Sequence, residues 1–121
     1  MQALVLAALL SLAPDLEIAL PDAVWLTPQE IEAFRAEALR GDMRHVERLI
    51  DHYAYIDNDP VEIEYWTRLH AEQGECGPVT SYWKLLKARG STFRADEWAQ
   101  RRKQACAALW REWGRSPEDG R

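Results

Sequence analysis

Residues 38–42 read Ala-Leu-Arg-Gly-Asp, and 33 positions later residues 71–75 read Ala-Glu-Gln-Gly-Glu. In each stretch the alanine lets two helices approach closely, the glycine ends a helix, and the acidic residue is placed to cap the next helix. At the same offset Val46 corresponds to Val79 and Leu49 corresponds to Tyr82. A repeat of this length predicts helix pairs that bury their apolar faces by stacking on their neighbours.

Start and stop signals along the chain predict an all-α fold with about five amphipathic helices and no sheet. The 121 residues include 31 Ala and Leu but only 10 Val and Ile, a composition that favours helix. A capping box, Thr-Pro-Gln-Glu at residues 27–30, opens the first helix. We expect the helices to open at Thr27, Asp42, Asp59, Gly77 and about Phe93, and to end at Gly41, Tyr53, Gly74, Gly90 and Trp113, with a polar loop over residues 55–59.

The chain from Glu37 to Leu86 resembles the Sel-one-like class of tetratricopeptide-related repeats. The residues that carry the resemblance are Ala38, Gly41, Leu49, Tyr53, Tyr65, Trp66 and the stretch 71–74. The chain departs from the family pattern at Ile63, where a small residue is usual, and at His70, where an alanine is usual. The resemblance covers less than half of the chain. It implies a short antiparallel helix-pair solenoid that acts as a protein-binding scaffold.

The chain divides into four expected segments. Residues 1–13 hold an apolar run, too short to span a bilayer, that fits the hydrophobic part of a secretory signal peptide. An N-terminal helix packed on the domain is the alternative. Residues 14–26 are expected to be extended, residues 27–114 to form one helical-repeat domain, and residues 115–121 to be a frayed tail. A signal peptide places the protein in the periplasm or outside the cell, without membrane insertion; otherwise it is cytoplasmic.

The two cysteines are expected to form a disulfide. Cys76 lies 14 residues before Gly90, and Cys106 lies 15 residues after Ser91. In a helical hairpin that turns at residues 90–91, arms of nearly equal length bring the two cysteines to the same height. Two buried free thiols are the alternative, and two cysteines without further ligands do not make a zinc centre.

The remaining motifs predict no catalytic, cofactor-binding or metal-binding residue. His45 and His52 share a helix face, but no acidic residue or cysteine completes a metal site there. The carboxylates of residues 57, 59, 62 and 64 are a less favoured candidate for glycan hydrolysis. Asp59 as a helix cap and Glu62 as the partner in its capping box account for most of that cluster. The basic run 101–103 is expected to be a solvated helix face, and the acidic chain argues against nucleic-acid binding.

Charge and aromatic residues point instead to a protein partner. Residues 1–64 carry 13 acidic and 4 basic residues, a net charge of −9, whereas residues 65–121 carry 7 acidic and 11 basic residues, a net charge of +4. Trp66, Trp83, Trp98, Trp110 and Trp113 fall on apolar stripes and are expected in the core. The candidate partner-binding residues are Asp51, Asp57, Asp59, Glu62, Glu64, Tyr65 and Tyr82, where the two tyrosines would line a concave face.

These features favour a non-catalytic protein that binds another protein. The first hypothesis is an exported bacterial immunity or inhibitor protein that neutralises a toxin or an enzyme with a basic cleft, because an acidic surface steers a basic partner. A scaffold or adaptor of an envelope assembly is the second hypothesis. A small carboxylate-dependent glycan hydrolase is the third.

Overall fold

The computed structural model describes residues 24–114 and confirms an all-α fold with five helices and no strand among these residues. The helices are α3 (Pro28–Leu39), α4 (Met43–His52), α5 (Pro60–Ala71), α6 (Cys76–Ala88) and α7 (Thr92–Glu112). None of the described helices is long and apolar enough to cross a membrane. The expected signal peptide at 1–13, most of the extended segment 14–26, and the tail at 115–121 lie outside the described residues.

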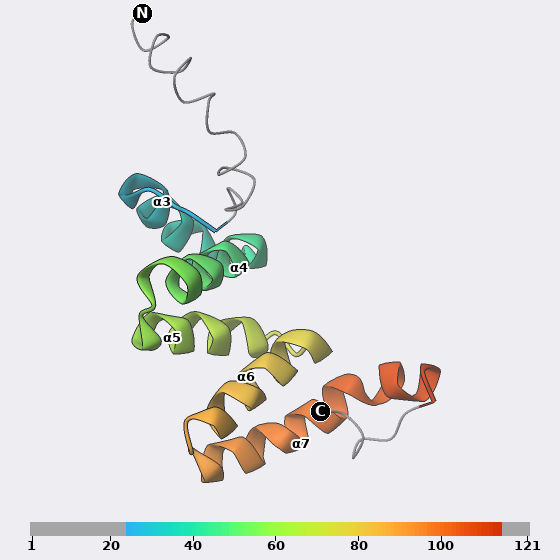
Figure 1. Cartoon of the computed structure of the whole chain (residues 1–121). Coiled ribbons are helices and arrows are strands. Elements are labelled where there is room, and N and C mark those ends of the chain that lie inside the picture. Colours follow the sequence, from blue (N-terminus) through green and yellow to red (C-terminus); the bar gives the residue numbers. More distant parts are fainter. Residues whose placement is uncertain (1–23, 115–121) are drawn as a thin grey trace, which may run out of the picture.

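The helices pack in chain order, each against the next. The main contacts join α3 to α4, α4 to α5, α5 to α6 and α6 to α7. Figure 1 shows α3 at one end of the stack and α7 at the other. Sequential packing of this kind is what the 33-residue repeat requires, because each helix buries its apolar face against its chain neighbour. The helix-pair solenoid itself stays a prediction.

Three of the predicted helix caps are present. Thr27 and Glu30 form the reciprocal capping box of α3. Asp42 accepts a hydrogen bond from the backbone N–H of Arg44, and Asp59 accepts from the first turn of α5. At the repeated position Glu75 is the N-cap residue of α6, but its side chain makes no capping hydrogen bond. The start of α6 is therefore held by other contacts.

The prediction of a polar loop over residues 55–59 is wrong for residues 55–57. The chain continues from α4 into a π-helical turn, η1 (Tyr53–Asp57), which Asn58 ends in the left-handed conformation at φ 53°. The backbone N–H of Asp59 donates to the carbonyl of Tyr53 over 3.0 Å and closes the turn. Tyr53 is buried in the core, and its packing holds the turn that the polar residues after it predict as loop.

The core consists of two clusters along the stack. The first lies between α3, α4 and α5, and its buried residues are Leu26, Ala38, Val46, Leu49, Tyr53 and Trp66. The second lies between α5, α6 and α7, and its buried residues are Ala71, Val79, Tyr82, Leu86, Ala95 and Trp98. Trp113, which was expected in the core, is 56% exposed at the end of α7.

The disulfide joins α6 to α7. The sulfur atoms of Cys76 and Cys106 lie 2.03 Å apart, as the equal arms of the hairpin predict. Cys106 is fully buried, whereas Cys76 is partly exposed at the first residue of α6. The bond thus fixes a helix start that has no side-chain cap, and it fits an oxidising compartment.

Arg102 corrects the expectation of a solvated basic run. It is buried, with its guanidinium 4.2 Å from the ring centroid of Trp83 and 4.9 Å from that of Trp110. Its Nε donates to the hydroxyl of Thr80 over 3.3 Å. The two rings flank the cation and replace part of its hydration, so Arg102 belongs to the contact between α6 and α7.

His52 ties the chain ahead of α3 to α4. The backbone N–H of Leu26 donates to Nδ1 of His52 over 3.2 Å, and Nε2 lies 3.1 Å from a carboxylate oxygen of Asp57. Because Nδ1 accepts a hydrogen bond, the ring proton is on Nε2 and faces Asp57. Leu26 is buried in the first core cluster, so the packed unit includes a residue before position 27.

Candidate functional site

Most of the carboxylates predicted to contact a partner protein form hydrogen bonds or ion pairs within the fold. Asp57 pairs with His52, and Asp59 caps α5 through the backbone N–H groups of Val61 and Glu62. These two residues were predicted as a contact surface for a basic protein. In the structure each of them makes a contact within the fold.

Glu62 joins α5 to α3. Its Oε1 accepts from Arg35 over 2.9 Å and from the indole Nε1–H of Trp66 over 3.0 Å. The hydrogen bond to Glu62 is the largest effect on Arg35 and raises the pKa of its guanidinium. The sequence predicts that Glu62 completes a capping box with Asp59, and this prediction is wrong. The side chain of Glu62 is held instead by Arg35 of the neighbouring helix α3.

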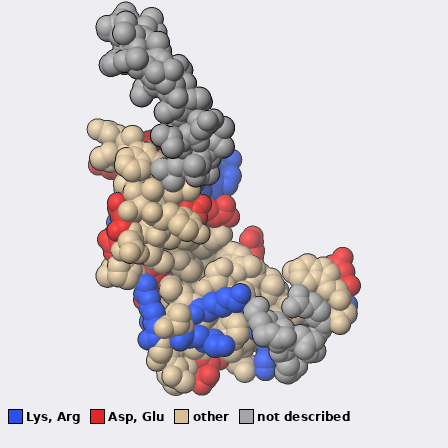
Figure 2. Space-filling model, viewed as in Figure 1, with Lys and Arg blue, Asp and Glu red and all other residues tan. Residues whose placement is uncertain are grey.

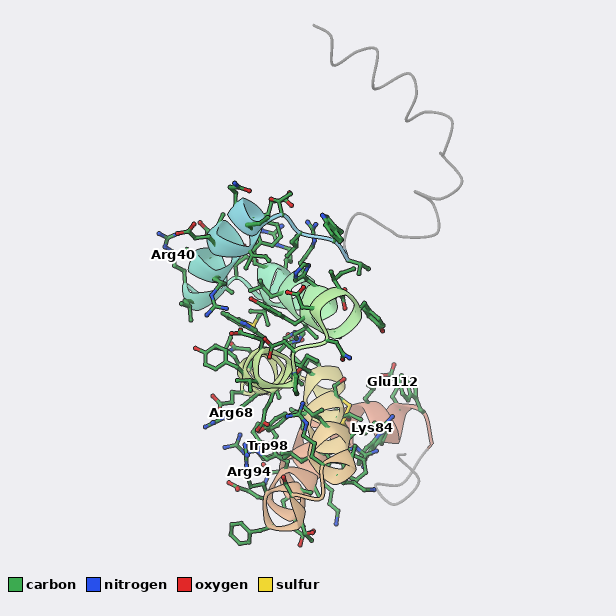
Figure 3. The ribbon with its side chains drawn as sticks, turned by 60° about the vertical axis from the view of Figure 1, so that its left-hand side comes forward. Arg40, Arg68, Lys84, Arg94, Trp98 and Glu112 are labelled. Atoms are coloured by element: carbon green, nitrogen blue, oxygen red, sulfur yellow. A yellow bond between two sulfur atoms is a disulfide. The ribbon has the colours of Figure 1, made fainter. Side chains whose placement is uncertain are left out.

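Glu64 joins α5 to the last two helices. It pairs with Arg89 over 2.7 Å and with Arg94 over 3.1 Å, and it accepts from the hydroxyl of Tyr82 over 3.3 Å. Figure 3 shows Arg94 of α7 and Arg68 of α5 on the same side of the molecule. Burial raises the pKa of Glu64, but the hydrogen bonds and positive charges around it outweigh burial and leave the pKa below its usual value.

The two predicted binding tyrosines have opposite environments. Tyr82 is fully buried, and its hydroxyl contacts Glu64 and Arg94, so it is not part of a binding surface. Trp83, the next residue, is half-buried, which reverses the expected order of this aromatic pair. Tyr65 is 48% exposed and lines an open surface depression, whose other lining residues are Pro60, Val61, Glu64, Arg68 and Arg89.

Asp51 alone among the predicted carboxylates lies in a groove without an internal partner. The groove runs over α4, α5 and the start of α6, has a volume of about 480 Å³, and is lined by Glu47, Ile50, Asp51, Thr67, His70, Glu75, Gly77, Pro78 and Ser81. Within residues 24–114 the carboxylates of Asp51 and Glu75 make no hydrogen bond or ion pair. They are available to a ligand.

A third polar side chain of the groove makes no hydrogen bond within the described chain. Thr67 on α5 is 7% exposed, yet its hydroxyl makes no hydrogen bond with any residue of the described chain. The hydroxyl is not one of the fully enclosed polar atoms of the described chain that lack a hydrogen bond, so it reaches the open groove that Thr67 lines. Thr67 thus places an unused donor and acceptor among the carboxylates of the groove.

The groove is acidic, and the surroundings of Asp51 disfavour the ionised form of its carboxyl group. Burial raises the pKa of Asp51, the neighbouring charge of Glu47 raises it further, and Arg48 acts in the opposite direction. Nε2 of His70, which also lines the groove, lies 3.5 Å from a carboxylate oxygen of Glu47. A cation that enters the groove would relieve the unfavourable environment of Asp51.

Asp51→Asn is expected to stabilise the protein at neutral pH. The pKa of Asp51 is raised in the folded state, so the ionised carboxylate destabilises the fold at pH values above that pKa. The gain should be about 0.5 kcal/mol at most, because solvent screens a carboxylate in an open groove. It should disappear as the pH falls through the folded pKa toward the ordinary value of 3.8. Urea unfolding of both proteins at pH 7 and pH 3 tests this, and a variant destabilised at pH 7 would contradict it.

Charge on the wider surface follows the division seen in the sequence, with an acidic first half and a basic second half. On the face shown in Figure 2, acidic side chains are spread over α3 to α5, whereas lysines and arginines gather over α6 and α7. Among residues 24–114 no three His, Cys, Asp or Glu side chains converge as metal ligands. The lining of the groove supplies carboxylates and a hydroxyl.

Comparison with models of known protein families, with curated proteins and with solved structures gives no match to this chain. Sequence reasoning found Asp51 but missed Glu47, Thr67 and Glu75. Only Glu47 carries a signal in the sequence, because it lies four residues before Asp51 on the same helix face.

Proposed function

We propose that this protein is a non-catalytic interaction module that holds a basic segment of a partner protein in the groove over α4, α5 and α6. The observation that carries the proposal is the pair of carboxylates, Asp51 and Glu75, that have no internal partner. Most of the other predicted carboxylates are engaged within the fold. A groove that keeps two of them free is suited to bind positive charge.

Three features support a protein as the partner. Residues of three consecutive helices line the groove, which is open to the surface rather than enclosed. The negative charge of residues 1–64 steers a basic partner toward this end of the stack. The resemblance to Sel-one-like repeats also implies a protein-binding scaffold.

The more specific form of the proposal is an exported immunity or inhibitor protein that covers the basic cleft of a toxin or enzyme. The disulfide fits an oxidising compartment, and the apolar run at residues 1–13 supports export. An envelope adaptor would use the same groove, and the two functions differ in whether the bound partner loses an activity. Nothing favours a glycan hydrolase, because Glu62 and Glu64 are each held by arginine.

Neutralising the two free carboxylates is expected to weaken binding of a basic peptide. With hexalysine as the probe, Asp51→Asn combined with Glu75→Gln should lower the affinity about tenfold, since two charge contacts are lost. The wild-type affinity should fall as the salt concentration rises. Fluorescence anisotropy of a labelled peptide at 20 and 200 mM salt measures both effects.

Asp96→Asn combined with Glu97→Gln is the matched control, because it removes the same charge from exposed positions on α7. Its affinity for hexalysine should stay within twofold of the wild type. An equal loss in both double variants would show that the peptide responds to overall charge, and this would contradict the proposed groove.

A further inference from the structure

We infer that the groove contains a specific slot for one lysine side chain of the partner, whose ammonium group is held by Asp51, Glu75 and the hydroxyl of Thr67. The inference rests on the proposed function and adds the chemical identity of the bound group. It also assigns a binding role to Thr67, which the overall acidity of the groove does not require.

The number and origin of the acceptors favour an ammonium group. Asp51 lies on α4, Thr67 on α5, and Glu75 at the start of α6, so three acceptors come from three different helices. A lysine ammonium is compact and has three donors that point in different directions. An arginine guanidinium is planar and prefers one carboxylate that accepts two parallel hydrogen bonds.

Glu47 contributes charge to the slot and is not assigned as a ligand. Nε2 of His70 lies 3.5 Å from its carboxylate, so Glu47 already has a neighbour inside the groove. Asp51 forms no ion pair within residues 24–114; the charge of Glu47 raises its pKa, and the charge of Arg48 lowers it. The cation is therefore expected closer to Asp51 and Glu75 than to Glu47.

The walls of the groove suit the rest of a lysine side chain. Ile50 and Pro78 provide apolar surface beside the carboxylates. Lysine covers such surface with its four methylene groups while its charged end stays among polar groups. At Gly77 an added Cβ would meet no atom within 4 Å, so this edge of the groove is open to an incoming side chain.

The hydroxyl of Thr67 separates this inference from general attraction between charges. Thr67→Val keeps the shape of the side chain and removes only the hydroxyl. Because that hydroxyl has no partner in the fold, the variant should be at least as stable as the wild type. Any loss of lysine binding would then come from a lost contact with the ligand.

The test uses the tripeptide acetyl-Gly-Lys-Gly-amide and NMR titration of the ¹⁵N-labelled, oxidised full chain. We expect millimolar binding to the wild type, as is typical for a ligand of this size. Thr67→Val should weaken binding about threefold or more, whereas Thr67→Ser, which keeps the hydroxyl, should bind like the wild type. The norleucine tripeptide, which lacks the ammonium group, should not bind, and the arginine tripeptide should bind at least about threefold more weakly.

Three results would overturn the slot. They are unchanged affinity in Thr67→Val, equal binding of the norleucine peptide, and tighter binding of the arginine peptide. In each case hexalysine binding that still depends on Asp51 and Glu75 would leave the proposed function intact. If hexalysine binding does not depend on those two carboxylates, the proposed function itself fails.

Discussion

Trp66→Ala is expected to lower the free energy of unfolding by about 4 kcal/mol, the usual size for removing a fully buried indole. Trp66 is 0% exposed in the first core cluster, and it packs with buried residues from α3 and α4. Its Nε1–H donates to Glu62, and the guanidinium of Arg35 lies 5.4 Å from its ring centroid. The substitution therefore leaves a cavity and removes a hydrogen-bond partner from Glu62.

Urea unfolding followed by circular dichroism measures this effect. Trp113→Ala is the matched control, because Trp113 is 56% exposed, and it should change the free energy of unfolding by less than about 0.5 kcal/mol. If Trp66→Ala costs less than about 1 kcal/mol, Trp66 is not the centre of the first cluster.

Reduction of the disulfide is expected to lower the free energy of unfolding by about 3 kcal/mol. Cys76 and Cys106 are 30 residues apart, and cross-linking a loop of this length restricts the unfolded chain by roughly that amount. The first turn of α6 adds to the effect, since it contains Gly77 and Pro78 and has no side-chain cap. Glu75 and Pro78 line the groove, so lysine-peptide binding should weaken with the loss of the bond.

Comparison of the oxidised protein with the protein in excess dithiothreitol measures both changes. The double variant Cys76→Ser, Cys106→Ser should behave like the reduced protein and be insensitive to dithiothreitol. Equal stability of the oxidised and reduced forms would contradict the role of the bond in holding the start of α6.

Local signals in the sequence predicted much of this fold. The caps at Thr27, Asp42 and Asp59 act within a few residues of themselves, so they can be read without tertiary structure. The cysteine pair also follows from the sequence, because two equal arms on either side of a turn determine the height at which they meet. The π-helical turn after α4 was missed, because burial of Tyr53 stabilises it against the polarity of the residues that follow.

Aromatic placement needed information that the sequence does not contain. Adjacent helix residues differ by about 100° in direction, so periodicity alone could not decide which of Tyr82 and Trp83 is buried. Glu64 and Arg94, from two other helices, satisfy the tyrosine hydroxyl and allow its burial. Trp83 lies instead against Arg102, where its ring contacts a cation.

The candidate site could be predicted only in part for the same reason. Asp57, Asp59, Glu62 and Glu64 form a dense acidic cluster in the sequence. Asp59 caps its own helix, but Glu62 and Glu64 are held by arginines from other parts of the fold, namely Arg35, Arg89 and Arg94. Asp51 remained a candidate because no cation of residues 24–114 forms an ion pair with it, although the charge of Arg48 lowers its pKa. Thr67 and Glu75 join Asp51 through packing of α5 and α6 on α4, which no local pattern reveals.

The most direct test of the account is to map where hexalysine binds on the ¹⁵N-labelled protein by chemical-shift changes of backbone amides. The account predicts that the largest changes cluster at Asp51, Thr67, His70 and Gly77, and that they are lost in the variant Asp51→Asn, Glu75→Gln. Changes of equal size along the exposed acidic residues of α3, such as Glu32, would contradict it. The peptide would then be attracted by the acidic half of the chain as a whole, and the groove would have no specific role.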